Sequence, residues 1–345
     1  MGPTPRFEVI AMTIHMNLAQ DSYDILLERG LLSKANQYLN LNRRVLVVTD
    51  TGVPEIYAKT VAAQCKKSII CTVEMGEESK SLDTFGQLLQ TMLEQDFSRK
   101  DCVVAVGGGV VGDLSGFAAS AYMRGIDFYN IPTTLLSQID SSIGGKTAIN
   151  LGGTKNIVGA FYQPKSVLID PDLLKTLPQR QIANGLAEAI KMSLTSDKEL
   201  FELLETQDME SNLEEIILRC LNIKKNVVEQ DEKEAGLRRI LNFGHTVGHG
   251  IESASGLYHG ECIALGMLPM CGDGLRPRVV DVLKKHSLYR VLPYDWDKIT
   301  EAAFHDKKAD GDTVTVTLVK EPGSFELKTM KCLEVMERAK ACLEG

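Results

Sequence analysis

The sequence lacks three features that would point to a membrane, a nucleic acid or a secreted protein. Uncharged runs such as Cys102–Gly112 are well short of the roughly 18 apolar residues that a membrane-spanning helix needs. The 38 Lys+Arg against 46 Asp+Glu give a formal net charge of −8, which provides no general attraction for DNA, RNA or an anionic membrane. Residues 1–17 lack the pattern of a secretory signal, and the eight cysteines include no CxxC pair. We therefore expect a cytoplasmic protein with reduced thiols, in which any anionic ligand is small and locally held.

The first half of the chain has the pattern of an α/β domain. With 345 residues, 44% of them hydrophobic, the chain exceeds the roughly 250–300 residues at which a single core stops growing, so two domains are expected. Helix-like segments alternate with five β-branched runs that we expect to be strands buried on both faces: Arg44–Thr49, Ser68–Val73, Cys102–Val106, Phe128–Pro132 and Ser166–Asp170. This alternation predicts a Rossmann-like parallel sheet in a domain of residues 1–176.

The second half is predicted to be mainly helical. Strand-like runs nearly vanish after Leu177, and long helical patterns cover 179–194, 212–230, 239–255 and 260–270. One alternating stretch, 313–318, precedes an amphipathic closing helix at 331–344. We expect residues 177–345 to form an α-helical domain that binds metal and substrate.

A glycine-rich turn follows the central predicted strand. Cys102–Val106 runs directly into GGGVVGD at 107–113 and then into a helical segment. Glycines there let the backbone approach a pyrophosphate, and the helix offers its positive end. A single GxGxxG match is weak, because a strand–helix turn without ligand has the same pattern. Asp50, at the end of an earlier strand, is equally compatible with binding ribose hydroxyls and with capping a helix.

A basic cluster follows this turn. Arg124, Lys146, Lys155 and Asn156 fall within 33 positions and are interspersed with glycine pairs. Lysine charge with amide and backbone donors suits an oxyanion such as phosphate, although the P-loop spacing is absent. The surrounding apolar residues make a merely solvated basic loop the less favoured interpretation.

The histidines form a metal-like pattern. His245 and His249 stand four residues apart on one helix face, and His259 is close behind them. Glu188 lies in an otherwise apolar helix. A carboxylate and two imidazoles with open positions would bind catalytic zinc. A single buried histidine is usually structural, but here three of six histidines fall within 15 positions. No GxSxG elbow supports serine-based catalysis.

The motifs GGGVVGD, IPTTLLSQIDSSIGGKTAIN, KNIVGAFYQP, NGLAEAIK, GLRRILNFGHTVGH and HGE occur in an order that resembles the 3-dehydroquinate synthase family. The resemblance extends from Tyr23 to Leu318. It implies an NAD-dependent lyase that converts 3-deoxy-D-arabino-heptulosonate 7-phosphate into 3-dehydroquinate and phosphate, in the shikimate pathway of aromatic amino acid biosynthesis. Oxidation at C5, phosphate elimination, reduction and intramolecular aldol closure follow one another without net oxidation.

The resemblance also implies roles for particular residues of this chain. The metal, zinc or alternatively cobalt, would be held by Glu188, His245 and His259. The catalytic set would be His249, Lys146, Asp140 and Lys191. The NAD+ site would use Asp50, Glu77, Lys80, Gly108, Gly109, Val110, Asp113, Thr133, Thr134, Lys155 and Thr176. Substrate phosphate would contact Lys146, Asn156, Asn242, and Lys307 or Lys308, with Arg124 from the neighbouring subunit of a homodimer. The substrate carboxylate would contact Lys224 and Arg238.

Two departures from the family pattern and three alternatives accompany these expectations. Gly52 stands where the family commonly has Asn beside the adenine ribose, and Met267–Leu292 looks shorter and more irregular than the family's helix pair. A different sugar-phosphate cyclase would lack the carboxylate-binding pair. A metal-dependent polyol dehydrogenase would not need the phosphate cluster. A catalytically silent nucleotide sensor would have lost Glu188, His249 or a lysine, and none is lost.

Overall fold

The computed structural model describes residues 11–234, 236–304 and 312–344, which form two compact units. The first contains 11–133 and 145–175, and the second contains 134–144 and 176–344. The sequence-based division placed a single boundary after residue 176, whereas the chain also enters the second unit at 134–144 and returns. This segment belongs there because Leu135 and Ile139 are fully buried and its π-helical turn, Ser137–Ser141, packs against two helices of that unit.

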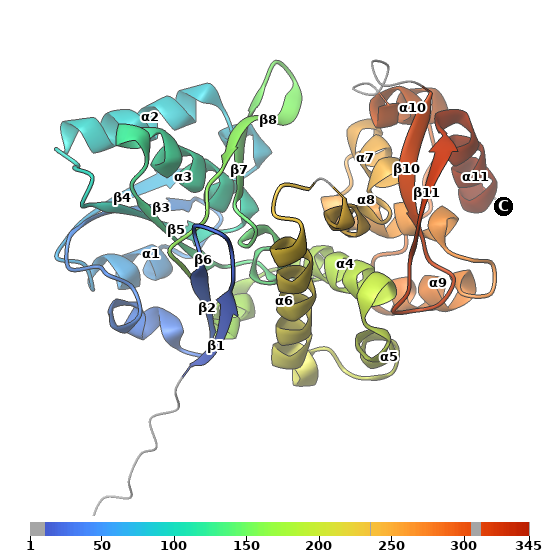
Figure 1. Cartoon of the computed structure of the whole chain (residues 1–345), viewed down its shortest axis with the longest axis horizontal. Helices are drawn as coiled ribbons and strands as arrows, with labels where there is room; N and C mark the ends of the chain where they lie inside the picture. Colours follow the sequence, from blue (N-terminus) through green and yellow to red (C-terminus); the bar gives the residue numbers. More distant parts are fainter. Residues whose placement is uncertain (1–10, 235, 305–311, 345) are drawn as a thin grey trace, which may run out of the picture. The chain divides into compact units, whose positions relative to one another are not determined.

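The first unit is built on a seven-stranded sheet (Figure 1). Its order is β1-β2-β9-β6-β5-β3-β4, and only the β1–β2 pair is antiparallel. The strands are β1 Met12–Met16, β2 Tyr23–Leu27, β3 Arg44–Asp50, β4 Lys67–Val73, β5 Cys102–Gly107, β6 Asp127–Pro132 and β9 Ser166–Ile169. The predicted Rossmann-like parallel sheet is therefore confirmed. β1 and β2 are additional strands that the sequence analysis did not predict.

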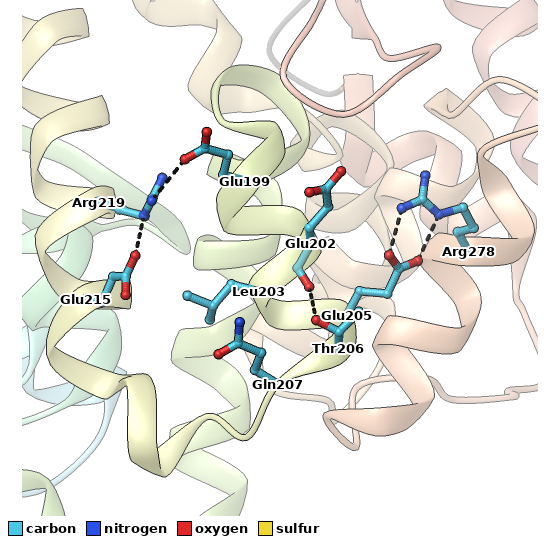
Figure 2. A pocket seen from close by; sticks show the side chains of 9 residues that line it. All are labelled: Glu199, Glu202, Leu203, Glu205, Thr206, Gln207, Glu215, Arg219 and Arg278. Atoms are coloured by element: carbon cyan, nitrogen blue, oxygen red, sulfur yellow. Dashed lines mark hydrogen bonds and ion pairs between the residues drawn. The ribbon is translucent and has the colours of Figure 1, made fainter.

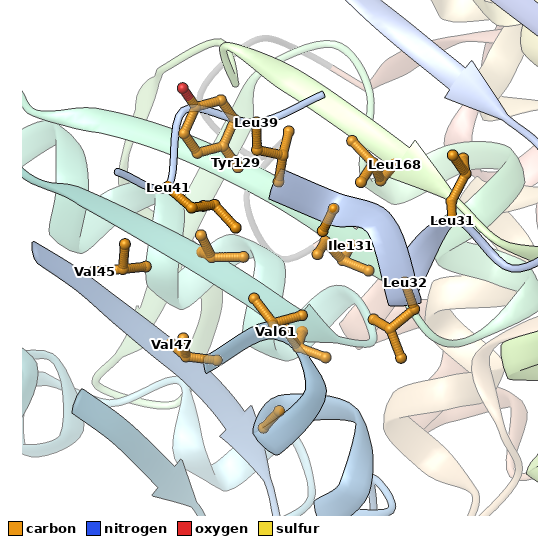
Figure 3. Close-up of a cluster of buried hydrophobic side chains, with 14 of the residues drawn as sticks. Leu31, Leu32, Leu39, Leu41, Val45, Val47, Val61, Tyr129, Ile131 and Leu168 are labelled. Atoms are coloured by element: carbon orange, nitrogen blue, oxygen red, sulfur yellow. The ribbon is translucent and has the colours of Figure 1, made fainter. Parts of the chain in front are cut away.

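Helices cover both faces of this sheet. One face packs against the 3₁₀ helix Leu31–Gln37 and α1 (Glu55–Ala62), and Figure 3 shows the apolar cluster between them. The other packs against α2 (Leu82–Glu94) and α3 (Gly109–Ala121). Alternate residues of β3 supply the two cores, as the period of a strand requires. The expectation of burial on both faces is wrong for β4, an edge strand in which only the last residue is fully buried.

A two-stranded hairpin completes the first unit. It consists of β7 (Lys146–Leu151) and β8 (Thr154–Phe161), joined at two glycines with positive φ, and it packs on α3. The sequence analysis did not predict this hairpin. Most of β8 is exposed, and its sequence lacks an apolar alternation.

The second unit is mainly helical, as predicted (Figure 1). Its helices are α4 Gln179–Ser196, α5 Lys198–Thr206, α6 Leu213–Gln230, α7 His245–Ala254, α8 His259–Met267, α9 Arg276–Lys285, α10 Trp296–Phe304 and α11 Cys332–Glu344. A hairpin of β10 (Thr313–Leu318) and β11 (Glu326–Lys331) lies among them. A single helix over 239–255 is wrong, because a 3₁₀ turn ends at Asn242 and Gly244, at φ +80°, interrupts the chain before α7. In the irregular 267–292 segment, a 3₁₀ turn containing Pro269 ends the α8 region before α9 begins.

The eight cysteines are all free thiols, in agreement with the absence of a CxxC pair. Within the described ranges, no helix has both the length and the apolar character required to cross a bilayer.

Candidate active site

Close glycine contacts bring three helices of the second unit together. A Cβ on Gly260 of α8 would lie 2.2 Å from the Asn184 carbonyl oxygen of α4, and a Cβ on Gly266 would lie 2.1 Å from the Gly244 carbonyl oxygen that precedes α7. Only glycine permits such approaches. Glu188 on α4, His245 on α7 and His259 on α8 therefore meet.

The carboxylate of Glu188 faces two imidazoles. Its Oε1 lies 3.4 Å from His259 Nε2 and 3.7 Å from His245 Nε2. His249, one turn after His245, brings a third imidazole, and one ring nitrogen from each histidine lies within 4.8 Å of the others. The structure thus assembles the four residues that the sequence pattern grouped, with His249 the most exposed histidine of the three.

Burial and neighbouring charges shift the pKa values of these three side chains. Burial would raise the pKa of Glu188, but the charge of Lys191 and the nearby imidazoles hold it well below its usual range. Burial and Lys191 lower the pKa of His245 well below its ordinary value, so that ring is neutral. Burial lowers the pKa of His259 as well, but the carboxylates of Glu188 and Glu252 outweigh it and raise the value to about 9.

These donors fit a divalent metal ion. The side chain of Glu188 is 1% exposed, and neither of its oxygens accepts a hydrogen bond of normal geometry from a described residue, although the Lys191 ammonium lies against Oε2. The Nδ1 atom of His245 is 3.2 Å from the Phe243 carbonyl oxygen, which can only accept, so Nε2 is left for a metal. One carboxylate and two imidazoles with further positions open is a ligand set typical of catalytic zinc.

Buried charges continue from this cluster. Lys191 lies between Glu188 and Asp140, 4.0 Å from Asp140 Oδ2, and Lys224 donates to the carboxylate and the carbonyl of Asp140. Arg238 is also buried and donates to the carbonyls of Gly144 and Glu232. Burial lowers the pKa of Lys224, whereas the two carboxylates raise that of Lys191 against burial. The structure places Lys224 on Asp140, a pairing that the sequence analysis did not predict.

The first unit offers a nucleotide-type site at the edge where its strands end. The strand order reverses between β3 and β5, and open α/β sheets bind ligands at such a switch point. Asp50 ends β3 and accepts from the Gly52 amide, so it does not cap α1, whose N-cap is Pro54. Burial raises the pKa of Asp50. Gly108 precedes α3, whose first turn has no side-chain cap. Such uncapped amides can hold a pyrophosphate.

Lys80 joins several of the residues assigned to NAD+. Its buried ammonium lies 2.7 Å from Asp113 Oδ2 on α3, 3.7 Å from Glu77 Oε1, and against the side-chain oxygen of Asn156. Asn156, expected at the substrate phosphate, is thus placed beside the NAD+ set within this unit. Its role with phosphate stays a prediction.

The remaining expected residues occupy several places. Within the first unit, the Thr133 amide N–H donates to the Gly107 carbonyl oxygen. Lys146 and Lys155 lie on the β7–β8 hairpin. Arg124 lies beyond the opposite end of α3 from Gly109, so it does not join the glycine turn of its own unit. The second unit contains Thr134, Thr176 and Asn242, the last bonded to Glu234. Lys307 and Lys308 lie outside the described residues.

The surroundings of Gly52 do not exclude a larger residue. A Cβ there would lie 2.5 Å from Met75 Sδ, so a larger residue would require the exposed Met75 side chain to move.

A separate cavity of about 510 Å³ lies over α5 and is not suited to an anion (Figure 2). Four glutamates line it, and its two arginines, Arg219 and Arg278, are already paired with carboxylates.

Sequence comparison decides the family. The family model described as 3-dehydroquinate synthase N-terminal matches residues 70–184, and the model described as 3-dehydroquinate synthase C-terminal matches residues 185–309. The chain belongs to the 3-dehydroquinate synthase family. The 3-dehydroquinate synthase of Pelobacter propionicus is 41% identical over 358 residues, covering 93% of this chain and 99% of that protein.

Solved structures of two other synthases share the fold of this chain. A 2-deoxy-scyllo-inosose synthase complexed with carbaglucose-6-phosphate, NAD+ and Co2+ is 28% identical, with a TM-score of 0.86 and coverage of 96% of this chain and 100% of that one. ValA, a 2-epi-5-epi-valiolone synthase from Streptomyces hygroscopicus subsp. jinggangensis with NAD+ and Zn2+ bound, is 29% identical, with a TM-score of 0.85 and coverage of 95% and 98%.

The sequence analysis missed one carboxylate that contacts the histidine cluster and a second that lies two residues after His259. Glu252 contacts His259 Nδ1, and its spacing of three from His249 was a usable signal. Glu261, in the HGE motif, is fully buried, pairs with Arg180 and Arg290, and accepts from the Tyr258 amide, which helps to fix the start of α8 at His259.

Proposed function

We propose that the protein converts 3-deoxy-D-arabino-heptulosonate 7-phosphate into 3-dehydroquinate and phosphate, acting as a phosphate-eliminating carbon–oxygen lyase of the shikimate pathway. The observation that carries the proposal is the buried cluster of the second unit. There a carboxylate facing two imidazoles adjoins three buried cations, Lys191, Lys224 and Arg238. A substrate that is both oxidised at a hydroxyl and anionic at two ends needs both features.

Glu188, His245 and His259 would hold a divalent ion, zinc or cobalt, and the β3–β5 edge with Lys80 and Asp113 would hold NAD+. When bound, the metal ion and NAD+ would supply acidification of a substrate hydroxyl and hydride transfer at its carbon. The two related cyclase structures, which contain NAD+ with Co2+ or Zn2+, support this pairing.

The protein's own side chains would bind the substrate and move protons. Lys224 and Arg238 would bind the substrate carboxylate, Asp140 and Lys191 its hydroxyls, and His249 would transfer a proton at the oxidised position. By the family resemblance, the phosphate would contact Lys146, Asn156, Asn242, and Lys307 or Lys308. Arg124 lies away from the glycine turn of its own unit, which supports its contribution across a homodimer. We expect the enzyme to be cytoplasmic.

One observation favours a second candidate. The Lys224 ammonium already contacts Asp140, so its charge is partly neutralised before any substrate carboxylate binds. This suits a cyclase whose sugar-phosphate substrate has no carboxylate. A polyol dehydrogenase would need none of the three buried cations.

The test is an assay with purified protein, NAD+, Zn2+ and the heptulosonate phosphate. We expect stoichiometric release of phosphate and formation of 3-dehydroquinate, without accumulation of NADH absorbance. Glucose 6-phosphate serves as the control substrate. Turnover of glucose 6-phosphate but not of the heptulosonate would establish the other cyclase, and steady NADH formation without phosphate release would establish a dehydrogenase.

A further inference from the structure

Glu252 is the carboxylate on the far side of His259 from Glu188. Its Oε2 lies 2.9 Å from His259 Nδ1, while His259 Nε2 lies 3.4 Å from Glu188 Oε1. The two nitrogens of one ring therefore face carboxylates on different helices, α7 and α4. Since an ionised carboxylate only accepts, Nδ1 carries a proton that it donates to Glu252.

The helix geometry makes this contact part of the cluster. Glu252 follows His245 by seven residues and His249 by three, so all three side chains lie on one face of α7. Its side chain is 18% exposed, more buried than most surface carboxylates of this unit.

We infer that Glu252 is a positioning residue that holds the His259 ring in the tautomer and orientation that direct Nε2 toward the metal position. The inference rests on the proposed metal site. Carboxylates that orient metal-binding histidines in this way commonly contribute 10–100-fold to metal affinity. The Nδ1 atom of His245 faces a backbone carbonyl oxygen, that of Phe243. Of these two histidines, His259 is therefore the one whose Nδ1 partner can be changed by substitution.

Three variants separate positioning from structural support. Glu252→Ala removes the acceptor, and Glu252→Gln keeps an oxygen that can accept from Nδ1 while removing the charge. Ser253→Ala is the matched control, because Ser253 is the next residue on α7, is exposed, and donates to the His249 carbonyl. Thermal unfolding of each metal-free variant verifies that the fold is retained.

The experiment measures Zn2+ affinity by competition with a chelator, and the visible absorption of the Co2+-loaded proteins. We expect Glu252→Ala to bind Zn2+ about 10–100-fold more weakly with an altered Co2+ spectrum, Glu252→Gln to recover most of the affinity, and Ser253→Ala to match the wild type. Equal affinities and spectra for the wild type and both Glu252 variants would overturn the positioning role alone. A wild-type protein that binds neither metal stoichiometrically would overturn the metal site and this role together.

Discussion

Two groups of charged side chains in the second unit, one around Arg219 and one around Lys191, differ in their exposure to solvent. Around Arg219, Asp197, Glu199 and Glu215 approach its guanidinium at 3.0, 3.1 and 2.9 Å, and Glu199 is 78% exposed. Around Lys191, the carboxylate of Glu188 is 1% exposed and its oxygens lack normal hydrogen bonds from the described residues. Arg219 itself is 29% exposed, so this group is the more exposed of the two, and Figure 2 shows two of its ion pairs.

The two groups differ in the hydration free energy that their charges lose on folding. An exposed pair contributes about 0–1 kcal/mol and carries little penalty, because water solvates its charges. Buried ions lose several kcal/mol of hydration each, which is recovered only with good geometry. The buried group has three cations, Lys191, Lys224 and Arg238, for the two carboxylates of Glu188 and Asp140. Such an excess of buried positive charge is expected where an anionic substrate completes the charge balance.

The largest effect is expected from Glu188→Gln, which keeps the shape and removes the charge. The variant should lose bound metal and fall about 10³-fold or more in turnover, because metal-based charge stabilisation amounts to several kcal/mol. Elemental analysis and the phosphate-release assay test this. Full turnover in a metal-free Glu188→Gln protein would contradict it.

Lys224→Ala should weaken binding of the carboxylated substrate by about 2–5 kcal/mol, which is the usual effect of removing one partner of a buried charged contact. An analogue without the carboxylate should be little affected. Lys225→Ala is the matched control, since Lys225 is adjacent on α6 and pairs with Glu229. Equal losses of kcat/KM for both compounds would show that Lys224 does not select the carboxylate.

Metal affinity should depend on pH with a definite sign. His259 has a pKa raised to about 9, so below that value a metal must displace its proton, whereas the lowered pKa of His245 keeps that ring neutral. Zn2+ affinity should therefore rise about tenfold per pH unit from pH 6 to 8 and level off above about 9. A flat profile in chelator competition would rule out displacement of this proton.

The smallest effect is expected from Arg219→Ala in the exposed group. Thermal unfolding should indicate a loss of about 1 kcal/mol or less, reduced further in high salt. Metal content and turnover should match the wild type. A loss above about 3 kcal/mol would mean that the two groups do not differ in the way described.

The sequence predicted the elements whose patterns are local. The sheet strands followed from apolar β-branched runs, and the histidine cluster from the spacing of His245, His249 and His259. The β7–β8 hairpin was not predicted, because most residues of β8 are exposed and its sequence has no apolar alternation. The contact of Lys80 with Asn156 joins positions 76 residues apart, and Lys224 reaches Asp140 across 84. Such pairings depend on tertiary packing, which local patterns do not encode.

The division of labour among the histidines is tested most directly by metal content measured beside turnover in His245→Ala and His249→Ala. His245→Ala should lose the metal. His249→Ala should keep stoichiometric metal and near-normal NAD+ binding, yet lose about 10²–10⁴-fold in kcat, as expected for removal of a proton-transfer group. If His249→Ala is also purified without metal, His249 is a ligand and the roles assigned to this helix are wrong.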